Sequence, residues 1–265
     1  MIFSWKKKKN TKSVPAKSYS SPAGKRAYAI GDVHGCFNLM TTLLDKIEVD
    51  IKIHNDIHGE EAQSHIIFLG DLIDRGPNSA GVIEFLINYQ PDFARIHFVA
   101  GNHEESIVRA LSGESNLLMP WLEHGGFATS LSYGLDPASL RGQPAHILEH
   151  MIYSAIPRSH IKFLSGFADS VQFGDYFFCH AGVRPGIPIS DQDPKDLKWV
   201  RAEFLDSTVN HGAMIVHGHT IVENVEEKTN RIALDTGAYT SGLLSALCVE
   251  GETRRFIQTS NKNDR

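Results

Sequence analysis

The sequence predicts an α/β fold with partly parallel strands, because two kinds of segment alternate along the chain. Three apolar runs are rich in strand-forming residues, and each ends at Gly followed by Asp or Asn. They span residues 26–32, 65–71 and 95–102. An amphipathic, helix-like stretch follows each run, at residues 36–47, 78–89 and 104–112. A repeated strand–loop–helix unit is typical of α/β folds, in which ligands bind at the carboxyl ends of the strands.

The remaining elements follow from the same patterns. Residues 114–167 are expected to form helices interrupted at Pro120, Pro137, Pro144 and Pro157. From residue 170 onwards strands are expected again, at residues 170–175, 176–182, 213–219, 231–238 and 243–251. Because neither a solenoid repeat nor a dividing linker is evident, we expect one domain over residues 27–258, followed by a C-terminal tail over residues 259–265.

Composition narrows the class of protein. The 265 residues are 42% apolar, which is enough to bury a substantial core. The three cysteines, Cys36, Cys179 and Cys248, are scattered and form no C-x-x-C pair, which favours a reducing compartment. No apolar run approaches the roughly 20 residues needed to span a bilayer, and the apolar residues at the start precede the positive charges, which is the wrong order for a secretory signal. These features predict a cytoplasmic location.

Charge is distributed unevenly along the chain. Residues 1–26 contain eight of the 26 Lys and Arg residues and no acidic residue, so the body is strongly acidic. We expect a flexible basic N-terminal tail over residues 1–26, with weak contact to a membrane surface or another polyanion as the alternative. The acidic body offers no electrostatic track for a nucleic-acid duplex.

Polar side chains gather where the predicted strands end. Each of them alone is explained by a helix cap or by a packed histidine. Together they would bring several carboxylates and imidazoles to one sheet edge, where unpaired groups are costly. The candidates are Asp32, His34, Asp71, Asp74, Arg75, Asn102, His103, Glu104, His180, His217 and His219.

Bound metal ions would offset the cost of placing these polar groups together at the sheet edge. Oxygen and imidazole ligands without a thiolate suit manganese, iron or zinc, and they argue against a structural zinc site. More than four candidate ligands suggest two divalent ions that share a bridging carboxylate and a bridging water of lowered pKa. We expect manganese, with iron or zinc as alternatives. Hydrolysis of phosphate esters is the reaction that such a site suits best.

Three motifs carry a family resemblance. "GDVHG" at 31–35, "GDLIDRG" at 70–76 and "GNHEE" at 101–105 resemble, in this order, the signature blocks of the phosphoprotein phosphatase family within the calcineurin-like metallophosphoesterases. Later stretches extend the resemblance from Tyr28 to Glu250, and it is greatest to the bacterial serine/threonine protein phosphatase branch. It implies a central β-sandwich of two mixed sheets flanked by helices.

The resemblance also implies roles for individual residues. Its ligand set comprises Asp32 and His34 on one ion, Asp71 bridging both ions, and Asn102, His180 and His219 on the other. The family pattern Gly-His-Thr selects His219 rather than His217. His103 would protonate the leaving oxygen while Asp74 orients its ring. Arg75 and Arg201 would hold the phosphoryl oxygens, which Asn102 could also touch.

The predicted activity is metal-dependent hydrolysis of phosphoserine and phosphothreonine in proteins, or of small phosphate esters, by attack of a metal-bridging hydroxide. Symmetrical hydrolysis of dinucleoside polyphosphates is the alternative, and Asp74 argues against it because the nucleotide-cleaving relatives commonly replace this aspartate. A non-catalytic binding protein on this scaffold would have lost ligands, and none is missing. One departure, Ala100 where many relatives have arginine, puts substrate preference in doubt. The oligomeric state is left open.

Overall fold

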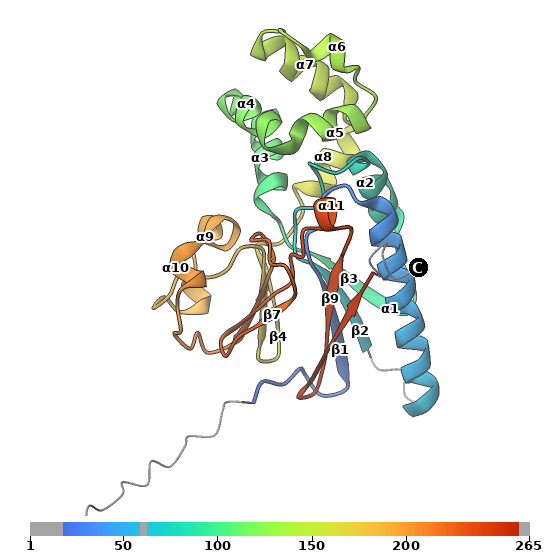
Figure 1. Ribbon diagram of the computed structural model, residues 1–265, viewed down its shortest axis with the longest axis vertical. Coiled ribbons are helices and arrows are strands. Elements are labelled where there is room, and N and C mark those ends of the chain that lie inside the picture. The colour runs from blue at the N-terminus through green and yellow to red at the C-terminus, as the bar shows by residue number, and fades with distance from the viewer. Residues whose placement is uncertain (1–17, 59–62, 260–265) are drawn as a thin grey trace, which may run out of the picture.

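Two mixed five-stranded sheets form the centre of the protein in a computed structural model, which describes residues 18–58 and 63–259 (Figure 1). The first sheet has the order β10–β9–β1–β2–β3. Its three strands from the first half of the chain are parallel to one another, whereas β9 is antiparallel to both β1 and β10. The bounds are β1 Lys25–Ile30, β2 Gln63–Phe68, β3 Ala94–Phe98, β9 Ser245–Glu250 and β10 Thr253–Gln258.

The second sheet comes from the later part of the chain and has the order β4–β5–β6–β8–β7. The neighbours β5, β6 and β8 are parallel, and antiparallel strands lie at both edges. The bounds are β4 Ser170–Phe173, β5 Tyr176–Cys179, β6 Met214–His217, β7 Glu226–Glu227 and β8 Arg231–Ala233. The carboxyl ends of β5 and β6 therefore meet, which is the reason that His180 and His219 come together.

Alternation along the strands builds three apolar cores. In β1, Ala27 and Ala29 belong to the core between the two sheets, whereas Tyr28 and Ile30 face the helices on the outer side. Because side chains alternate across a strand, one strand serves both cores. A third core packs the outer face of the second sheet against α9 and α10. The result is a layered arrangement of helix, sheet, sheet and helix.

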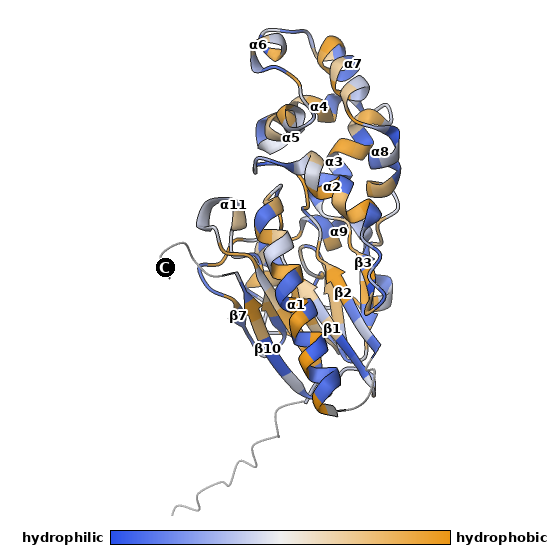
Figure 2. Cartoon of the chain, turned by 90° about the vertical axis from the view of Figure 1, so that its right-hand side faces the viewer, coloured by the Kyte–Doolittle hydropathy of each residue, from blue (hydrophilic) through white to orange (hydrophobic). Residues whose placement is uncertain are grey.

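Helices α1 and α2 cover the first sheet, and α9 and α10 cover the second (Figure 1). The helices from α3 to α8 form a layer beyond one end of the sheets, in which α5 and α8 pack against α2. Figure 2 shows apolar and polar residues alternating along α1, whose apolar side faces the sheet. The bounds are α1 Phe37–His58, α2 Ser79–Asn88, α3 Asn102–Leu111, α4 Leu118–Trp121, α5 Phe127–Ser132, α6 Pro137–Leu140, α7 Ala145–Ala155, α8 Arg158–Leu164, α9 Pro194–Trp199, α10 Ala202–Leu205 and α11 Ala238–Ser241; 3₁₀ turns span Ser115–Leu117 and Ile189–Asp191, and a π turn spans Leu122–Gly126.

The predicted fold class is confirmed, while the boundaries of the body need correction. Tyr19 is 4% exposed and Arg26 is fully buried, so residues 18–26 pack on the domain instead of forming a tail. Thr259 is also buried, and its Oγ1 accepts a hydrogen bond from the N–H of Leu244. The rest of the predicted tails, residues 1–17 and 260–265, lies outside the described residues. Within the described chain, no helix has the length and apolar character needed to cross a membrane.

Candidate active site

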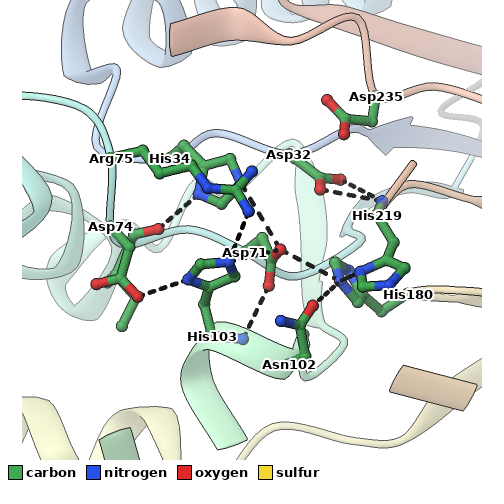
Figure 3. A network of polar contacts seen from close by, with 12 residues as sticks. Asp32, His34, Asp71, Asp74, Arg75, Asn102, His103, His180, His219 and Asp235 are labelled. Atoms are coloured by element: carbon green, nitrogen blue, oxygen red, sulfur yellow. Dashed lines mark hydrogen bonds and ion pairs between the residues drawn. The ribbon is translucent and has the colours of Figure 1, made fainter. Parts of the chain in front are cut away.

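Backbone strain marks the site before any side chain is considered. Among the described residues, five non-glycine residues have a positive φ, and all of them are predicted site residues: His34, Asp71, Asp74, Arg75 and His219. Such conformations cost free energy and concentrate at functional sites. The turns after β1, β2 and β6 are therefore held in shapes that aim polar side chains at a common point (Figure 3).

Asp71 lies at the point where these side chains meet. Its Oδ2 is 3.3 Å from His180 Nε2, 3.7 Å from His34 Nε2 and 3.8 Å from His103 Nε2. Its Oδ1 accepts a hydrogen bond from the backbone N–H of His103. Burial alone would raise the pKa of Asp71, but His180 and His103 outweigh burial and hold this pKa well below its usual range. The carboxylate is thus kept ionised among three imidazoles.

Two clusters of potential ligand atoms share Asp71. The first contains His34 and His103, the second contains His180 and His219, and the ligand atoms of each cluster lie within 4.8 Å of one another. A carboxylate common to both clusters is what a bridging ligand requires. The predicted position of Asp71 between two groups of ligands agrees with this geometry.

His180 connects the second cluster to Asn102. Its Nε2 lies 3.0 Å from Asn102 Oδ1 and 3.1 Å from His219 Nδ1. The Nε2 of His219 is buried and has no hydrogen-bond partner. Burial lowers the pKa of His219, and the neighbouring His180 lowers it further, so the ring is neutral, and Nδ1 is the nitrogen that it turns toward His180.

His217 does not join these clusters. Its ring packs edge-on against Phe204 at 5.1 Å, and its Nδ1 contacts the carbonyl of Gly218. The choice of His219 over His217 is the one that the geometry favours.

Asp32 lies beside the second cluster, and its predicted role as a metal ligand stays a prediction. Both of its carboxylate oxygens accept the backbone N–H of His219, at 3.2 and 3.0 Å, and Asp32 belongs to neither cluster of ligand atoms. It lies beside Asp235, which faces the site from the end of β8 (Figure 3). Burial, the charge of Asp235 and the charge of Asp71 raise the pKa of Asp32 well above its usual range.

The predicted dyad is present. His103 Nδ1 donates to Asp74 Oδ2 at 2.6 Å, and the same carboxylate accepts Trp121 Nε1 at 2.8 Å and Thr129 Oγ1 at 2.6 Å. Three donors fix the carboxylate, and the carboxylate in turn fixes the imidazole. Burial would lower the pKa of His103, but Asp71 and the hydrogen bond to Asp74 outweigh burial and raise this pKa to about 9.

Arg75 faces both histidines of the first cluster. Its Nη1 is 3.0 Å from His34 Nε2, and its Nη2 is 3.1 Å from His103 Nε2. Arg75 also lines a cavity of about 390 Å³ together with Asn102, His103 and Arg201. The two arginines expected to hold phosphoryl oxygens are therefore brought to one cavity at the edge of the site.

Sequence reasoning missed the roles of two carboxylates. Glu104 is buried and accepts the backbone N–H groups of Asp71, Leu72 and Gly101 at 2.8 to 2.9 Å, so it holds the turn that carries Asp71. Burial and the charge of Asp71 raise the pKa of Glu104 to about 7. Asp235 is also buried, and one of its oxygens has no hydrogen-bond partner. Asp235 follows an apolar strand in the same way as Asp32, and this pattern could have identified it.

The residues present fit divalent metal ions. They offer carboxylate, imidazole and amide donors without a thiolate, and their carboxylate and imidazole atoms cluster within ligand distance. Hard to borderline divalent cations prefer this mixed set of donors. Nothing in the donor set distinguishes manganese from iron or zinc, so manganese stays a prediction.

Two mixed sheets with an aspartate and histidine cluster at their strand ends define the class of metal-dependent phosphoesterases. The family model of the calcineurin-like phosphoesterases matches residues 25–239, and the chain belongs to this family. Phosphoesterases of this family depend on divalent metal ions.

Several known proteins are similar to the chain over most of its length. The asymmetrical bis(5'-nucleosyl)-tetraphosphatase PrpE of Bacillus subtilis is 28% identical over 224 residues, which cover 78% of this chain and 84% of the relative. Its counterpart in Oceanobacillus iheyensis is 29% identical, over 82% of this chain and 86% of the relative. A crystal structure provisionally assigned as a diadenosine tetraphosphatase has a TM-score of 0.62 at 19% identity and covers 92% of this chain and all of that one.

These relatives correct the predicted branch and activity. The curated relatives are named as nucleotide hydrolases, so the assignment to the bacterial serine/threonine protein phosphatase branch, with phosphoproteins as substrates, is wrong. The argument that failed is the one from Asp74. In this chain Asp74 orients His103, and that role is useful for any phosphoryl substrate, so its presence does not separate protein from nucleotide substrates.

Proposed function

We propose that the protein hydrolyses dinucleoside tetraphosphates asymmetrically, to a nucleoside triphosphate and a nucleoside monophosphate. The observation that carries the proposal is the similarity to asymmetrical tetraphosphatases over about four fifths of the chain. The alternative expected from the sequence was symmetrical cleavage, and the relatives favour the same substrate class with the other mode of cleavage. Arg75 and Arg201 beside the ligand clusters support a substrate that carries several phosphates.

Each site residue has a role in this proposal. His34, Asp71, Asn102, His180 and His219 would hold two divalent ions, with Asp71 shared between them and Asp32 completing the site. When bound, the ions supply Lewis-acid stabilisation of the phosphoryl oxygens and a water of lowered pKa.

The remaining groups act on the substrate directly. His103 gives a proton to the departing oxygen, and Asp74 keeps its ring in the orientation that this transfer needs. Arg75 and Arg201 bind phosphoryl oxygens through charge-assisted hydrogen bonds.

A substrate panel tests the proposal. The metal-stripped protein is reconstituted separately with manganese, iron and zinc, and its kcat/KM is measured on diadenosine tetraphosphate and on a phosphothreonine peptide. We expect the dinucleotide to be preferred by at least about 100-fold, with AMP and ATP as the products, because only the dinucleotide presents several phosphates to both arginines. Equal turnover of the two substrates, or two molecules of ADP as products, would contradict the proposal.

A further inference from the structure

Two cavities without a common lining residue adjoin the site. The arginine cavity, of about 390 Å³, is lined by Arg75, Asn102, His103, Arg109, Trp199 and Arg201, among others. The uncharged cavity, of about 480 Å³, is lined by Phe37, Asn38, Pro77, Asn78, Tyr239 and Ser241, among others. Both volumes fall in the range of small-molecule sites.

The site lies at the junction of the two cavities. Arg75 lines the arginine cavity, and its guanidinium carbon is 5.2 Å from the ring centre of Tyr239, which lines the uncharged cavity. The ring of Tyr239 also packs edge-on against His34 at 5.3 Å. A substrate extending from one cavity to the other would therefore pass the metal-ligand residues.

The cavities differ in charge. Among the described residues that line the uncharged cavity there is no Asp, Glu, Lys, Arg or His. The arginine cavity has three arginines and one carboxylate, Glu105, which is engaged by Trp199 Nε1 at 2.6 Å and by Lys198 Nζ at 3.3 Å. Arg109 is paired with Glu114, whereas Arg201 Nη1 makes a long contact of 3.3 Å to Thr220 Oγ1. Arg75 contacts imidazoles and the ring of Tyr239 rather than a carboxylate, so Arg201 and Arg75 are the cations available to a ligand here.

The position of His103 gives the substrate a direction. His103 lines the arginine cavity, and a group that donates a proton to the departing oxygen must lie on the side from which that oxygen leaves. The part of the substrate that keeps the attacked phosphorus does not leave through the arginine cavity, so it occupies the other side of the site. That side is the uncharged cavity.

Resting on the proposed function, we infer that the uncharged cavity binds the nucleoside monophosphate part of a dinucleoside tetraphosphate and that the arginine cavity binds the departing nucleoside triphosphate. The triphosphate carries the greater negative charge, and it matches the cavity with Arg75 and Arg201. The nucleoside of the monophosphate part meets the aromatic rings and neutral amide and hydroxyl groups of the other cavity. The difference in charge between the cavities thereby determines which end of the symmetric tetraphosphate is bound as the monophosphate part and which departs as the triphosphate.

The bond changes follow from this orientation. The oxygen of water bonds to the phosphorus next to the monophosphate's nucleoside, and the bond from this phosphorus to the bridging oxygen breaks. The electron pair stays on the bridging oxygen, which becomes the terminal oxygen of the triphosphate. His103 gives this oxygen a proton, and the attacking water loses one, so charge and atoms balance.

An isotope experiment reads the orientation directly. Diadenosine tetraphosphate is hydrolysed by the metal-loaded protein in water enriched in oxygen-18, for about one turnover, and the products are analysed by mass spectrometry. We expect the label in AMP and unlabelled ATP. Label in the terminal phosphate of ATP would overturn the inference while leaving asymmetrical hydrolysis intact. Absence of dinucleotide hydrolysis would instead refute the proposed function on which the inference rests.

Product binding, measured by calorimetry, assigns the two cavities without turnover. Arg201→Gln should weaken ATP binding about tenfold and change AMP binding less than about twofold. Asn38→Asp adds a negative charge to the uncharged cavity at an exposed position and should weaken AMP binding more than ATP binding. The matched control is Arg158→Gln, which removes the same charge from the exposed start of α8, outside both cavities, and should change neither affinity. Equal losses of ATP and AMP binding in Arg201→Gln would contradict the assignment.

Discussion

At the scale of single residues, backbone carbonyls decide which imidazole nitrogens face the cluster. His34 Nδ1 lies 2.8 Å from the carbonyl of Ile73, and His180 Nδ1 lies 2.8 Å from the carbonyl of Leu69. A carbonyl only accepts hydrogen bonds, so Nδ1 of each ring carries a proton, and Nε2 is the nitrogen that faces the cluster. The fold therefore presets the tautomers that metal ligation requires.

Asp71→Asn tests the shared carboxylate. The substitution removes the charge that two cations would share and keeps the shape, and asparagine tolerates the positive φ of 49° at this position. We expect the bound metal per chain to fall and kcat/KM to fall by about two orders of magnitude or more, with unchanged circular dichroism. Two tightly bound ions and near-normal turnover in this variant would exclude the bridging role.

His103→Ala and Asp74→Asn test proton donation. A poor leaving group needs protonation most, so His103→Ala should slow an alkyl phosphate by roughly 10² to 10⁴ and an activated nitrophenyl phosphate distinctly less. Asp74→Asn should show the same pattern more mildly, because it only misorients the ring. The measurement is kcat for both esters at saturating metal. Equal loss on the two esters, with normal metal content, would show that His103 positions phosphate and does not donate a proton.

At the scale of elements, α3 carries Asn102 and His103 into the site, and α4 and α5 of the same layer contact the site through Asp74. Trp121, the last residue of α4, and Thr129 in α5 both donate to the carboxylate of Asp74, and Arg75 N–H donates to the carbonyl of Gly125. Segments more than 40 residues apart in sequence thereby fix the orientation of His103. The layer is thus part of the catalytic scaffold and also one wall of the arginine cavity.

Trp121→Phe tests this attachment. The variant keeps an aromatic side chain and removes the N–H that contacts Asp74 at 2.8 Å. We expect a loss of roughly 1 to 3 kcal/mol of stability and a fall in kcat of a few fold, measured by denaturant unfolding and steady-state kinetics. Tyr133→Phe is the matched control, since it removes a 2.8 Å contact to His160 in the same layer without touching Asp74. A comparable fall in kcat in both variants would mean that Asp74 is not the point of attachment.

The sequence could predict those parts of the site that depend on strand ends. Asp32, Asp71 and His180 each follow an apolar strand, and parallel strands end at the same edge of a sheet. Glu104 could not be assigned a role, because its partners are three backbone N–H groups on turns whose shapes only the folded chain defines. The substrate class could not be predicted either, since Asp74 acts on the histidine rather than on the substrate.

At the scale of the whole molecule, the arrangement of the two sheets follows from the alternation of strand and helix segments and from their order in the chain. The edge strand β10 and the start of the domain do not follow from these patterns. Strand β10 was not predicted, although it completes the first sheet beside β9. Its residues are mostly exposed or half-buried, so the sequence lacks the apolar run that identifies an interior strand. Residues 18–26 were expected to be a tail for a related reason, since a charged residue such as Arg26 suggests an exposed position. In the fold, Arg26 is fully buried against Glu250 and Tyr28.

Buried histidines away from the site predict how the stability of the fold depends on pH. His65 Nδ1 lies 2.9 Å from His97 Nε2 on the neighbouring strand, and the ring of His65 is 7% exposed. Burial, with the charges of His97, Lys25 and Arg95, lowers the pKa of His65 from 6.5 to about 4. The folded state therefore binds this proton less readily than the unfolded chain. The contribution is complete above about pH 6.5 and is lost as the pH falls towards 4.

The free energy of unfolding should fall by about 2 kcal/mol on account of His65 between about pH 8 and about pH 5. Other buried histidines add to the slope, so the difference between two proteins isolates this residue. In His65→Phe, which keeps a ring against Phe173, the decrease should be smaller by that amount, measured by urea unfolding at several pH values. His150→Gln, at an exposed position on α7, should keep the slope of the original protein. If His65→Phe, folded normally at pH 8, lost stability towards acid as steeply as the original protein, the His65–His97 pair would not be a source of acid sensitivity.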